Sequence, residues 1–314
     1  MTPSVTSYLA HALARTTQST YRSGWSSYTR FCALHSIPRL PLTEATLLPF
    51  FAHLADRHLL HSTLRVYLSA LTYYSRIAGY PFNIRHMPRL HYLLMGVRRS
   101  QGGAFSVPRR TPLFPQHLVS LRTFLLAHYP PVDARMLWAA FTSAFFGLLR
   151  ASEYTCPTDS TIVPSTLLLT HFKCAPDFSS ASLRLPISKA DQFGRGVLVD
   201  LFPLPSPLCP LSAILHYLAV RRPLGSPLFL FADGMFLTRA HVVDILRSVF
   251  PAHPTLNTHS FRIGGASALA AAGVPDYVIR VMGRWSSDAY LRYVHIPTSS
   301  LRAFHHSMLG GFPA

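Results

Sequence analysis

Four side chains able to act on a phosphodiester lie within 35 residues of one another in the sequence. They are the imidazole of His259, the guanidinium of Arg262, the indole N–H of Trp285 and the phenol of Tyr293. Cations and N–H donors neutralise phosphate oxygens, and a hydroxyl group supplies a nucleophile. His259 and Arg262 are three residues apart, a spacing that places both side chains on one face of a helix. This combination indicates a site that holds a phosphodiester and attacks it without a metal ion.

Two further candidates lie upstream, directly after the apolar stretch 137–149. In Gly147-Leu-Leu-Arg150-Ala-Ser-Glu153, the carboxylate follows the guanidinium by three residues. A buried guanidinium needs an anionic partner, so Arg150 either pairs with Glu153 or binds the phosphate of a ligand. Together with Arg262 it would form a clamp of two guanidiniums on the non-bridging oxygens of one phosphate.

The chain has two lysines, Lys173 and Lys189. Lys189 lies where an apolar segment gives way to a polar turn that contains glycine, in Ile187-Ser-Lys189-Ala-Asp-Gln-Phe-Gly194. An ammonium group on a flexible stem, whose pKa shifts readily in a desolvated and cation-rich site, suits a general acid. Lys173 is the competing candidate, but no glycine-rich turn follows it. An exposed turn lysine without a chemical role is the plain alternative.

Other residues of the candidate site also have plain structural alternatives. The chain has 17 histidines, so His259 is singled out only by its spacing to Arg262. Trp285 could serve as a packing residue and as an N–H donor at once. Tyr290 and Tyr293 lie three residues apart, and either phenol could be the nucleophile. Surrounding cations, rather than a dedicated carboxylate base, would favour the phenolate.

Taken in chain order, these segments form five elements that span 144 residues, from Arg150 to Tyr293. They are an Arg followed by an acidic residue, a Lys at a hairpin-like turn, His-x-x-Arg, Gly-Arg-Trp and a Tyr. The pattern resembles the tyrosine recombinase, or phage integrase, family. The residues within these motifs are similar to those of the eukaryotic mobile-element branch, the DIRS-like and Crypton-like elements. Each element alone is a weak signal, whereas five in the expected order are specific.

The resemblance implies a role for each residue of the candidate site. Arg150 and Arg262 would bind the scissile phosphate, Glu153 would orient the donors of the site, and Lys189 would protonate the departing 5′ oxygen. Of the two phenols, the resemblance favours Tyr293 as the nucleophile. The full set of implied catalytic residues is Arg150, Glu153, Lys189, His259, Arg262, Trp285 and Tyr293.

The composition indicates a polyanionic partner. The formal net charge is +17 and the pI is about 10.4, which points most simply to nucleic acid. The resemblance implies that this partner is double-stranded DNA. An acidic membrane surface is less favoured, because no polybasic run accompanies an amphipathic or lipidation signal. We expect no membrane span and no signal peptide. The expected location is the nucleus in a eukaryote and otherwise the cytoplasm.

Several chemistries are disfavoured by what the sequence lacks. It contains 12 acidic residues, of which two are glutamates, and they form no cluster of the kind that two-metal nucleases use. A phosphate-binding Gly-x-x-x-x-Gly-Lys loop is absent, so nothing implies ATP. The four cysteines are widely spaced, which suggests neither a zinc site nor a disulfide framework. We therefore expect no cofactor, no metal and no small-molecule substrate.

The apolar periodicity predicts a mainly α protein with a small antiparallel β-sheet and two domains. Residues 1–100 would form a helical DNA-clamping, or core-binding, domain: a loose tail over 1–15, then helices from Thr16, from Thr43, from Ser62 and over 88–99. Its candidate DNA contacts are Arg15, Arg22, Arg30, Arg65, Arg76, Arg98 and Arg99, although solvated arginines on a plain bundle are the alternative. Residues 101–112 contain Gly and Pro at turn positions and would form a linker.

Residues 113–314 would form the catalytic domain with a C-terminal tail. Helices are predicted over 115–128, 132–153, 211–220, 238–250, 258–272, 275–282 and 287–294, and strands over 167–172, 183–187 and 196–201. The tail 297–314 carries apolar residues that pack either on the same protomer or on a neighbour.

The function that the sequence favours is site-specific DNA recombination or integration for a mobile element, through a 3′-phosphotyrosyl intermediate. The resemblance implies a tetramer of this chain on two duplexes. Two alternatives stay open: a catalytically silent DNA-binding protein derived from a recombinase, and a nicking-resealing enzyme of the type IB topoisomerase kind.

Overall fold

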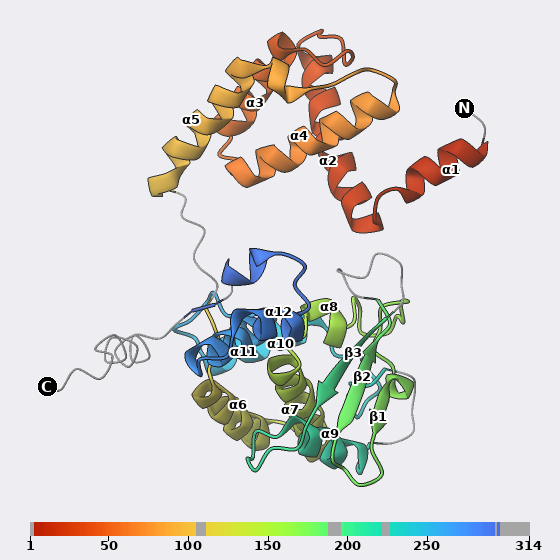
Figure 1. Cartoon of the computed structure of the whole chain (residues 1–314), viewed down its shortest axis with the longest axis vertical. Helices are drawn as coiled ribbons and strands as arrows, with labels where there is room; N and C mark the ends of the chain where they lie inside the picture. The colour runs from red at the N-terminus through yellow and green to blue at the C-terminus, as the bar shows by residue number, and fades with distance from the viewer. Residues whose placement is uncertain (1–2, 105–110, 188–195, 222–226, 293, 296–314) are drawn as a thin grey trace, which may run out of the picture. The chain divides into compact units, whose positions relative to one another are not determined.

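The computed structural model describes residues 3–104, 111–187, 196–221, 227–292 and 294–295 (Figure 1). The chain divides into two compact units, residues 1–107 and 108–314. Both units are rich in helices, and the second also contains a three-stranded antiparallel sheet. The predicted fold class, mainly α with a small antiparallel sheet, is confirmed.

The first unit is helical throughout its regular structure. Its elements are α1 (Pro3–His11), α2 (Arg15–Leu34), α3 (Glu44–Asp56), α4 (His61–Ile77), the 3₁₀ turn η1 (Ile84–His86) and α5 (Pro88–Ala104). The tail expected over 1–15 is wrong in part, because α1 is helical there. The Tyr73 hydroxyl of α4 donates to the carbonyl oxygen of Leu9 at 3.2 Å, which ties the end of α1 to this unit.

Aromatic side chains fill the core of the first unit. Tyr28 and Phe31 of α2 pack against Phe50 of α3, with ring centroids 5.1 and 5.4 Å apart. Helix α2 lies close to α4 at Gly24, where an added Cβ would lie 3.1 Å from the Cβ of Ala70. These contacts arise because the apolar residues recur at helical spacing, as the sequence predicts.

Helix α5 continues past residue 100, where the sequence analysis placed the start of a linker. The side chain of Gln101 accepts from the backbone N–H of His61 at 2.7 Å and donates to the carbonyl oxygen of Leu59 at 2.9 Å. Gln101 therefore satisfies backbone groups at the start of α4, where a helix leaves its first N–H groups unpaired. These two hydrogen bonds stabilise the last turn of α5, over residues 101–104.

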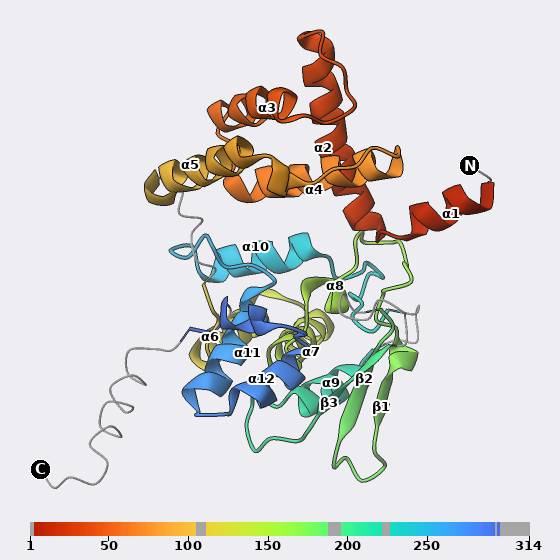
Figure 2. The same ribbon diagram turned by 45° about the horizontal axis from the view of Figure 1, so that its top comes forward.

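The second unit is built around α7 (Pro131–Phe146), in which every residue from Met136 to Phe145 is buried. Helices α6 (Pro115–His128), α9 (Pro210–Leu218) and α11 (Ser260–Ala271) pack against it (Figures 1 and 2). The remaining helical elements are α8 (Ala151–Tyr154), η2 (Leu169–His171), α10 (Arg239–Val249), α12 (Asp276–Gly283) and η3 (Asp288–Arg292). Within the described residues, no helix is long and apolar enough to cross a bilayer.

The sheet has the order β1 (Phe172–Cys174), β2 (Ala181–Leu185), β3 (Val197–Leu201), with antiparallel neighbours. Leu183 pairs with Val199 and is fully buried, so one face of the sheet packs on the core. The strand predicted over 167–172 is wrong: a 3₁₀ turn forms there, and the Nδ1 of His171 accepts from the backbone N–H of Leu168 at 3.1 Å. That local bond competes with strand pairing.

The helix predicted over 132–153 is confirmed as far as Phe146 but wrong beyond it, because the helix breaks at Gly147. An added Cβ on Gly147 would lie 2.7 Å from the carbonyl oxygen of Ser143, and Leu148 adopts a left-handed φ of +46°. The chain re-enters a helix only at Ala151, with Arg150 as the N-cap residue of α8. The break takes Arg150 out of a continuous helix. Similarly, the helix predicted over 287–294 is the 3₁₀ turn η3.

Candidate active site

Arg150 is held at the start of α8 by the carboxylate one turn later. Its backbone N–H donates to the Oε2 of Glu153 and its Nη1 donates to the Oε1, both at 2.8 Å. Its Nη2 donates to the backbone carbonyl oxygen of Arg284 at 3.2 Å. The structural pair that the sequence analysis weighed therefore exists. Because 17% of the Arg150 side chain stays exposed, the pair does not exclude a ligand.

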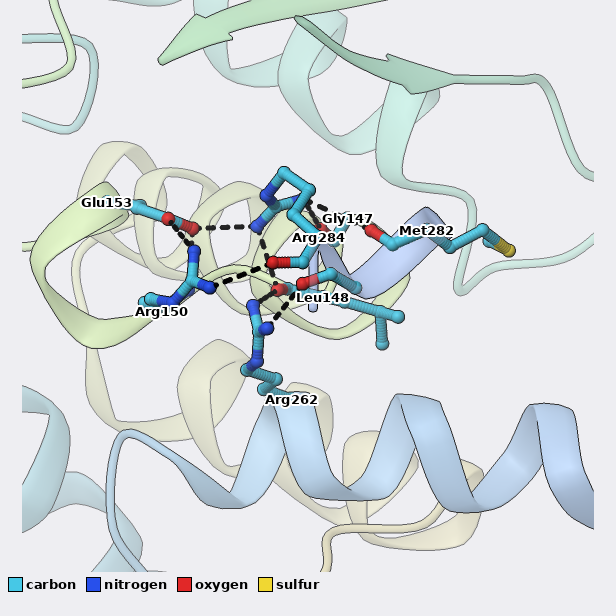
Figure 3. Close-up of polar contacts among 8 residues, drawn as sticks. Gly147, Leu148, Arg150, Glu153, Arg262, Met282 and Arg284 are labelled. Atoms are coloured by element: carbon cyan, nitrogen blue, oxygen red, sulfur yellow. Dashed lines mark hydrogen bonds and ion pairs between the residues drawn. The ribbon is translucent and has the colours of Figure 1, made fainter. Parts of the chain in front are cut away.

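Glu153 also binds a second guanidinium that the sequence analysis did not select. The Nη2 of Arg284 donates to its Oε2 at 2.8 Å. Arg284 is the residue that ends α12, more than 130 positions along the chain. Figure 3 shows the side chains of Arg150 and Arg284 both pointing toward the Glu153 carboxylate, Arg150 from below and Arg284 from the right in this view. One buried carboxylate thus joins the Arg150 segment to the Gly-Arg-Trp segment.

The pKa values of this cluster follow from its burial. Burial raises the pKa of Glu153, but Arg284, together with the backbone N–H and guanidinium of Arg150, outweighs it and holds that pKa below its usual value. For Arg284, burial is the largest influence and lowers the pKa, while Glu153 opposes it. Glu153 is therefore ionised at neutral pH.

Arg262 enters the same region from α11 and is 1% exposed. Its Nη1 donates to the carbonyl oxygen of Leu148 and its Nη2 to that of Gly283. The Leu148 oxygen also accepts from the Nη2 of Arg284 at 3.0 Å. Figure 3 shows Arg262 rising from α11 toward this loop. Arg150 and Arg262, 112 positions apart, are thus attached to the same short loop, 147–150.

Glycine allows α11 to approach that loop. A Cβ at Gly264 would lie 1.6 Å from the carbonyl oxygen of Leu113, and one at Gly265 would lie 2.4 Å from the carbonyl oxygen of Phe145. These two positions therefore tolerate no side chain without a shift of backbone. The two glycines thus allow close packing of α11 on Leu113 and on α7.

Trp285 lies over the guanidinium of Arg262, with the Cζ 4.2 Å from the ring centroid. Its six-membered ring occupies the space where Gly283 would carry a Cβ. A cation over an indole face is attracted by the ring quadrupole. Trp285 thus fixes Arg262 by packing, whatever its N–H contributes.

His259 precedes α11 and has helical backbone angles, with φ −81° and ψ −17°. Its backbone N–H donates to the Oδ1 of Asn257 at 2.9 Å, and its carbonyl oxygen accepts from Ile263 at 3.1 Å. It is half-buried and lies one turn before Arg262. Its role as proton shuttle or phosphate donor stays a prediction.

The two tyrosine candidates differ in what the structure shows of them. Tyr290 is buried, and its ring packs with Ala266, Ile279 and Trp285. A hydrogen bond with Asp276 raises the pKa of Tyr290, which disfavours its phenolate. Tyr293 lies outside the described residues.

The two lysine candidates also differ. Lys189 lies outside the described residues, as does most of the turn that contains it. Lys173 is exposed on β1, opposite Ser182 of β2. The general-acid role of Lys189 stays a prediction.

The first unit carries a basic groove of about 510 Å³. It is lined by Arg22 and Arg30 of α2, by Arg57 at the end of α3, and by three serine hydroxyl groups, of Ser23, Ser26 and Ser27. The unit has eleven arginines and two acidic residues in total. Guanidinium and hydroxyl groups are typical contacts of DNA phosphates. Arg76, in contrast, donates to the carbonyl oxygen of Phe82 at 3.2 Å and supports the fold.

Sequence reasoning missed Arg284 because nothing in the sequence distinguishes a buried arginine from an exposed one. The available signal was its place between Gly283 and Trp285 in the motif already selected. Arg57 was missed for a related reason: it lies beyond the last turn of α3 and joins the groove only through the folded arrangement.

The structure is similar to solved structures of DNA recombinases. XerH site-specific recombinase bound to palindromic difH substrate aligns with a TM-score of 0.57 at 14% identity, over 85% of this chain and 72% of that chain. Tn1549 transposon integrase in complex with transposon right end DNA aligns with a TM-score of 0.55 at 14% identity, over 91% of this chain and 93% of that chain. A lambda integrase dimer bound to a COC′ core site aligns with a TM-score of 0.52 at 13% identity, over 90% of this chain and 72% of that chain.

At these identities the likeness establishes the fold, which is that of the tyrosine recombinases. No protein-family model matches the chain, and a search of curated proteins finds no match.

The first prediction concerns the buried carboxylate. Glu153→Gln leaves Arg150 and Arg284 without their counter-charge, so the free energy of unfolding at pH 7 should fall by about 3–5 kcal/mol, measured by urea denaturation. The pKa of Glu153 is lower in the folded state than in the unfolded state, where it is about 4.3. The ionised carboxylate therefore stabilises the fold above that unfolded value, and this stabilisation is lost as the pH falls through the folded pKa. The difference between the wild type and Glu153→Gln should therefore shrink in acid.

The matched control is the other glutamate of the chain. Glu44 pairs with Arg89, whose side chain is 72% exposed, so Glu44→Gln should cost about 1 kcal/mol or less. A difference between wild type and Glu153→Gln that stays constant from pH 7 down to acid would contradict a charged role for Glu153.

Proposed function

We propose that this chain is a tyrosine recombinase that cleaves and rejoins DNA strands through a 3′-phosphotyrosyl intermediate. The observation that carries the proposal is the convergence of Arg150 and Arg262 on the loop 147–150, beside the carboxylate of Glu153. An excess of guanidinium charge out of water requires an anion, and a phosphodiester supplies one. The recombinase fold supports the same conclusion.

The proposed reaction begins with attack of the Tyr293 phenol oxygen on the scissile phosphorus. The bond from phosphorus to the 5′ oxygen breaks, and Lys189 gives that oxygen a proton. The phenol loses its own proton to His259 or to water. In the second step a 5′ hydroxyl of a partner strand gives its proton to Lys189 and attacks the phosphotyrosine, the bond from phosphorus to the phenol oxygen breaks, and His259 or water returns a proton to the phenol. Because the bond energy is kept in the phosphotyrosyl link, the step consumes no nucleotide.

We favour Tyr293 as the nucleophile because of the residue pattern, and the contacts of the residues that flank it in the sequence support this choice. On one side, Tyr290 is packed against Trp285, with ring centroids 6.2 Å apart. On the other side, the backbone N–H of His295 donates to the Oγ of Ser267 at 2.9 Å. Ser267 belongs to α11, the helix that carries Arg262. Tyr290 therefore packs against the tryptophan that covers Arg262, and His295 is bonded to the helix that carries Arg262.

The biological setting of the proposal is a mobile element, in line with the residue pattern. The working assembly would be a tetramer on two duplexes, acting in the nucleus of a eukaryotic host. Two-site recombination assays and sizing of the protein on DNA test this part, and they separate a recombinase from a nicking-resealing enzyme that uses one duplex.

Covalent trapping tests the nucleophile. The probe is a pool of duplexes with a randomised core and a nick, from which the released short strand diffuses away. Wild type should give an adduct that resists denaturant, and Tyr293→Phe should give none while binding DNA as before, because only the attacking oxygen is lost.

Tyr290→Phe is the matched control and should still form adducts, because it loses only a buried hydroxyl contact. Adducts from Tyr293→Phe that disappear in Tyr290→Phe would move the nucleophile to Tyr290. A wild type that gives none from any duplex would favour the silent DNA-binding alternative.

The pair of lysines allows a matched test of the general acid. On an ordinary phosphodiester recovered from the pool, Lys189→Ala should slow adduct formation by about 10²-fold or more. A 5′-bridging phosphorothiolate releases a thiolate, which needs no proton, so the same variant should recover most of its rate on that substrate. Lys173→Ala should behave as wild type on both. If Lys173→Ala instead shows the selective loss, the general acid is Lys173.

Salt dependence tests the basic groove of the first unit. Each phosphate contact contributes roughly 0.9 to the slope of log affinity against log salt. Arg22→Gln, Arg30→Gln and Arg57→Gln should each lower the slope by about that amount, measured by fluorescence anisotropy with a duplex of arbitrary sequence. Arg85→Gln changes an exposed arginine outside the groove and should leave the slope unchanged. Equal slopes in all four variants would remove the groove from the DNA interface.

A further inference from the structure

Arg284 has a pattern of contacts unlike that of the two phosphate-binding candidates. Its Nη1 donates to the carbonyl oxygens of Gly147 and Met282, at 3.0 and 3.3 Å. Its Nη2 donates to the carbonyl oxygen of Leu148 and to Glu153, at 3.0 and 2.8 Å. Each terminal nitrogen of a guanidinium carries two hydrogens. These four bonds use all of them, so the terminal nitrogens of Arg284 are committed to the protein and not to a phosphate.

The backbone of Arg284 also lies in an unusual place for an arginine. It ends α12 in the left-handed region, with φ +56° and ψ +45°. Helix ends favour glycine in that conformation, because a Cβ is strained there. Strain of this kind persists where the surroundings over-determine it. The side chain of Arg284 is 9% exposed, and its four hydrogen bonds hold the residue in this conformation.

The bonds of Arg284 reach both sides of Arg150. Its side chain holds Glu153, which holds the Nη1 and backbone N–H of Arg150, and its own carbonyl oxygen accepts from the Nη2 of Arg150. It also shares the Leu148 oxygen with Arg262. Figure 3 shows Arg284 between these groups. Arg284 is therefore the residue through which α12, the loop 147–150 and Glu153 are joined.

We propose that Arg284 is a positioning residue, which sets the directions of Arg150 and Arg262 toward one phosphate without touching it. This inference rests on the proposed function, since it concerns the same site. It differs from a purely structural role in one respect. Removal of Arg284 should impair strand cleavage in molecules that are folded and bound to DNA.

Two variants test the proposal on a duplex recovered from the nicked pool. Arg284→Gly removes the side chain and relieves the backbone strain, whereas Arg284→Lys keeps the charge but loses the planar fork. We expect Arg284→Gly to bind DNA within about threefold of wild type and to form adducts about 10²-fold more slowly, as for loss of a preorganised donor at a reacting centre. The rate of adduct formation by Arg284→Lys should lie between that of wild type and that of Arg284→Gly. Arg280→Lys, on the same helix and paired with Asp288 at the surface, should match wild type.

A rate–pH profile separates positioning from loss of stability. Arg150 and Arg284 are the charged groups that the structure places against Glu153, from the start of α8 and the end of α12. Without Arg284, Glu153 gains a proton more readily, so the cleavage rate of Arg284→Gly should fall from pH 7 to pH 5 more steeply than that of wild type. Adding Glu153→Gln should remove this extra pH dependence.

Thermal unfolding gives the folded fraction of each variant. Cleavage by folded Arg284→Gly at the wild-type rate, or a loss that follows the unfolded fraction with an unchanged pH profile, would overturn the proposal. If Arg284→Gly does not fold, Arg284→Lys decides: a wild-type rate would overturn the proposal. An absence of adducts from wild type overturns the proposed function itself, and is distinguished by appearing in every variant.

Discussion

The site depends on an imbalance of charge. Among the described residues, the guanidiniums of Arg150, Arg262 and Arg284 gather at the loop 147–150, while Glu153 supplies the carboxylate. Backbone carbonyls of Leu148 and Gly283 offset part of the positive charge. Cations removed from water are costly unless anions or dipoles compensate them. A phosphodiester bound beside Arg150 and Arg262 would complete this compensation, which is why the arrangement suits phosphoryl transfer.

The surrounding fold brings these three guanidiniums to the loop 147–150. The break after α7 presents the carbonyl oxygens of Gly147 and Leu148, and the left-handed backbone at Leu148 turns the chain toward Arg150. Gly265 lets α11 lie close to α7, and Gly264 lets it lie close to Leu113, so that Arg262 reaches that loop. Glu153 then locks the loop to the end of α12 through Arg284. Segments far apart in the sequence therefore contribute to one electrostatic centre.

The sequence predicted the fold class and several helices well, because apolar periodicity and caps are local signals. Helix α6 covers the predicted range 115–128, and the helix expected from Thr43 is α3, whose N-cap residue is Thr43. The break at Gly147 was missed because apolar residues continue through it, and only the left-handed turn at Leu148 reveals it. Arg150, Glu153 and Arg262 were found by motif, whereas Arg284 depends on burial, which is a property of the tertiary structure.

The most direct test of the charge imbalance is cleavage of a duplex whose scissile phosphate carries a methyl group in place of one non-bridging oxygen. That substrate has no negative charge for guanidiniums to neutralise. The rate loss caused by Arg262→Ala should then be much smaller on the methylphosphonate than on the phosphate, because the guanidinium acts on that charge. An equal loss on both substrates would show that Arg262 acts by some means other than neutralising the phosphate, and would contradict this account.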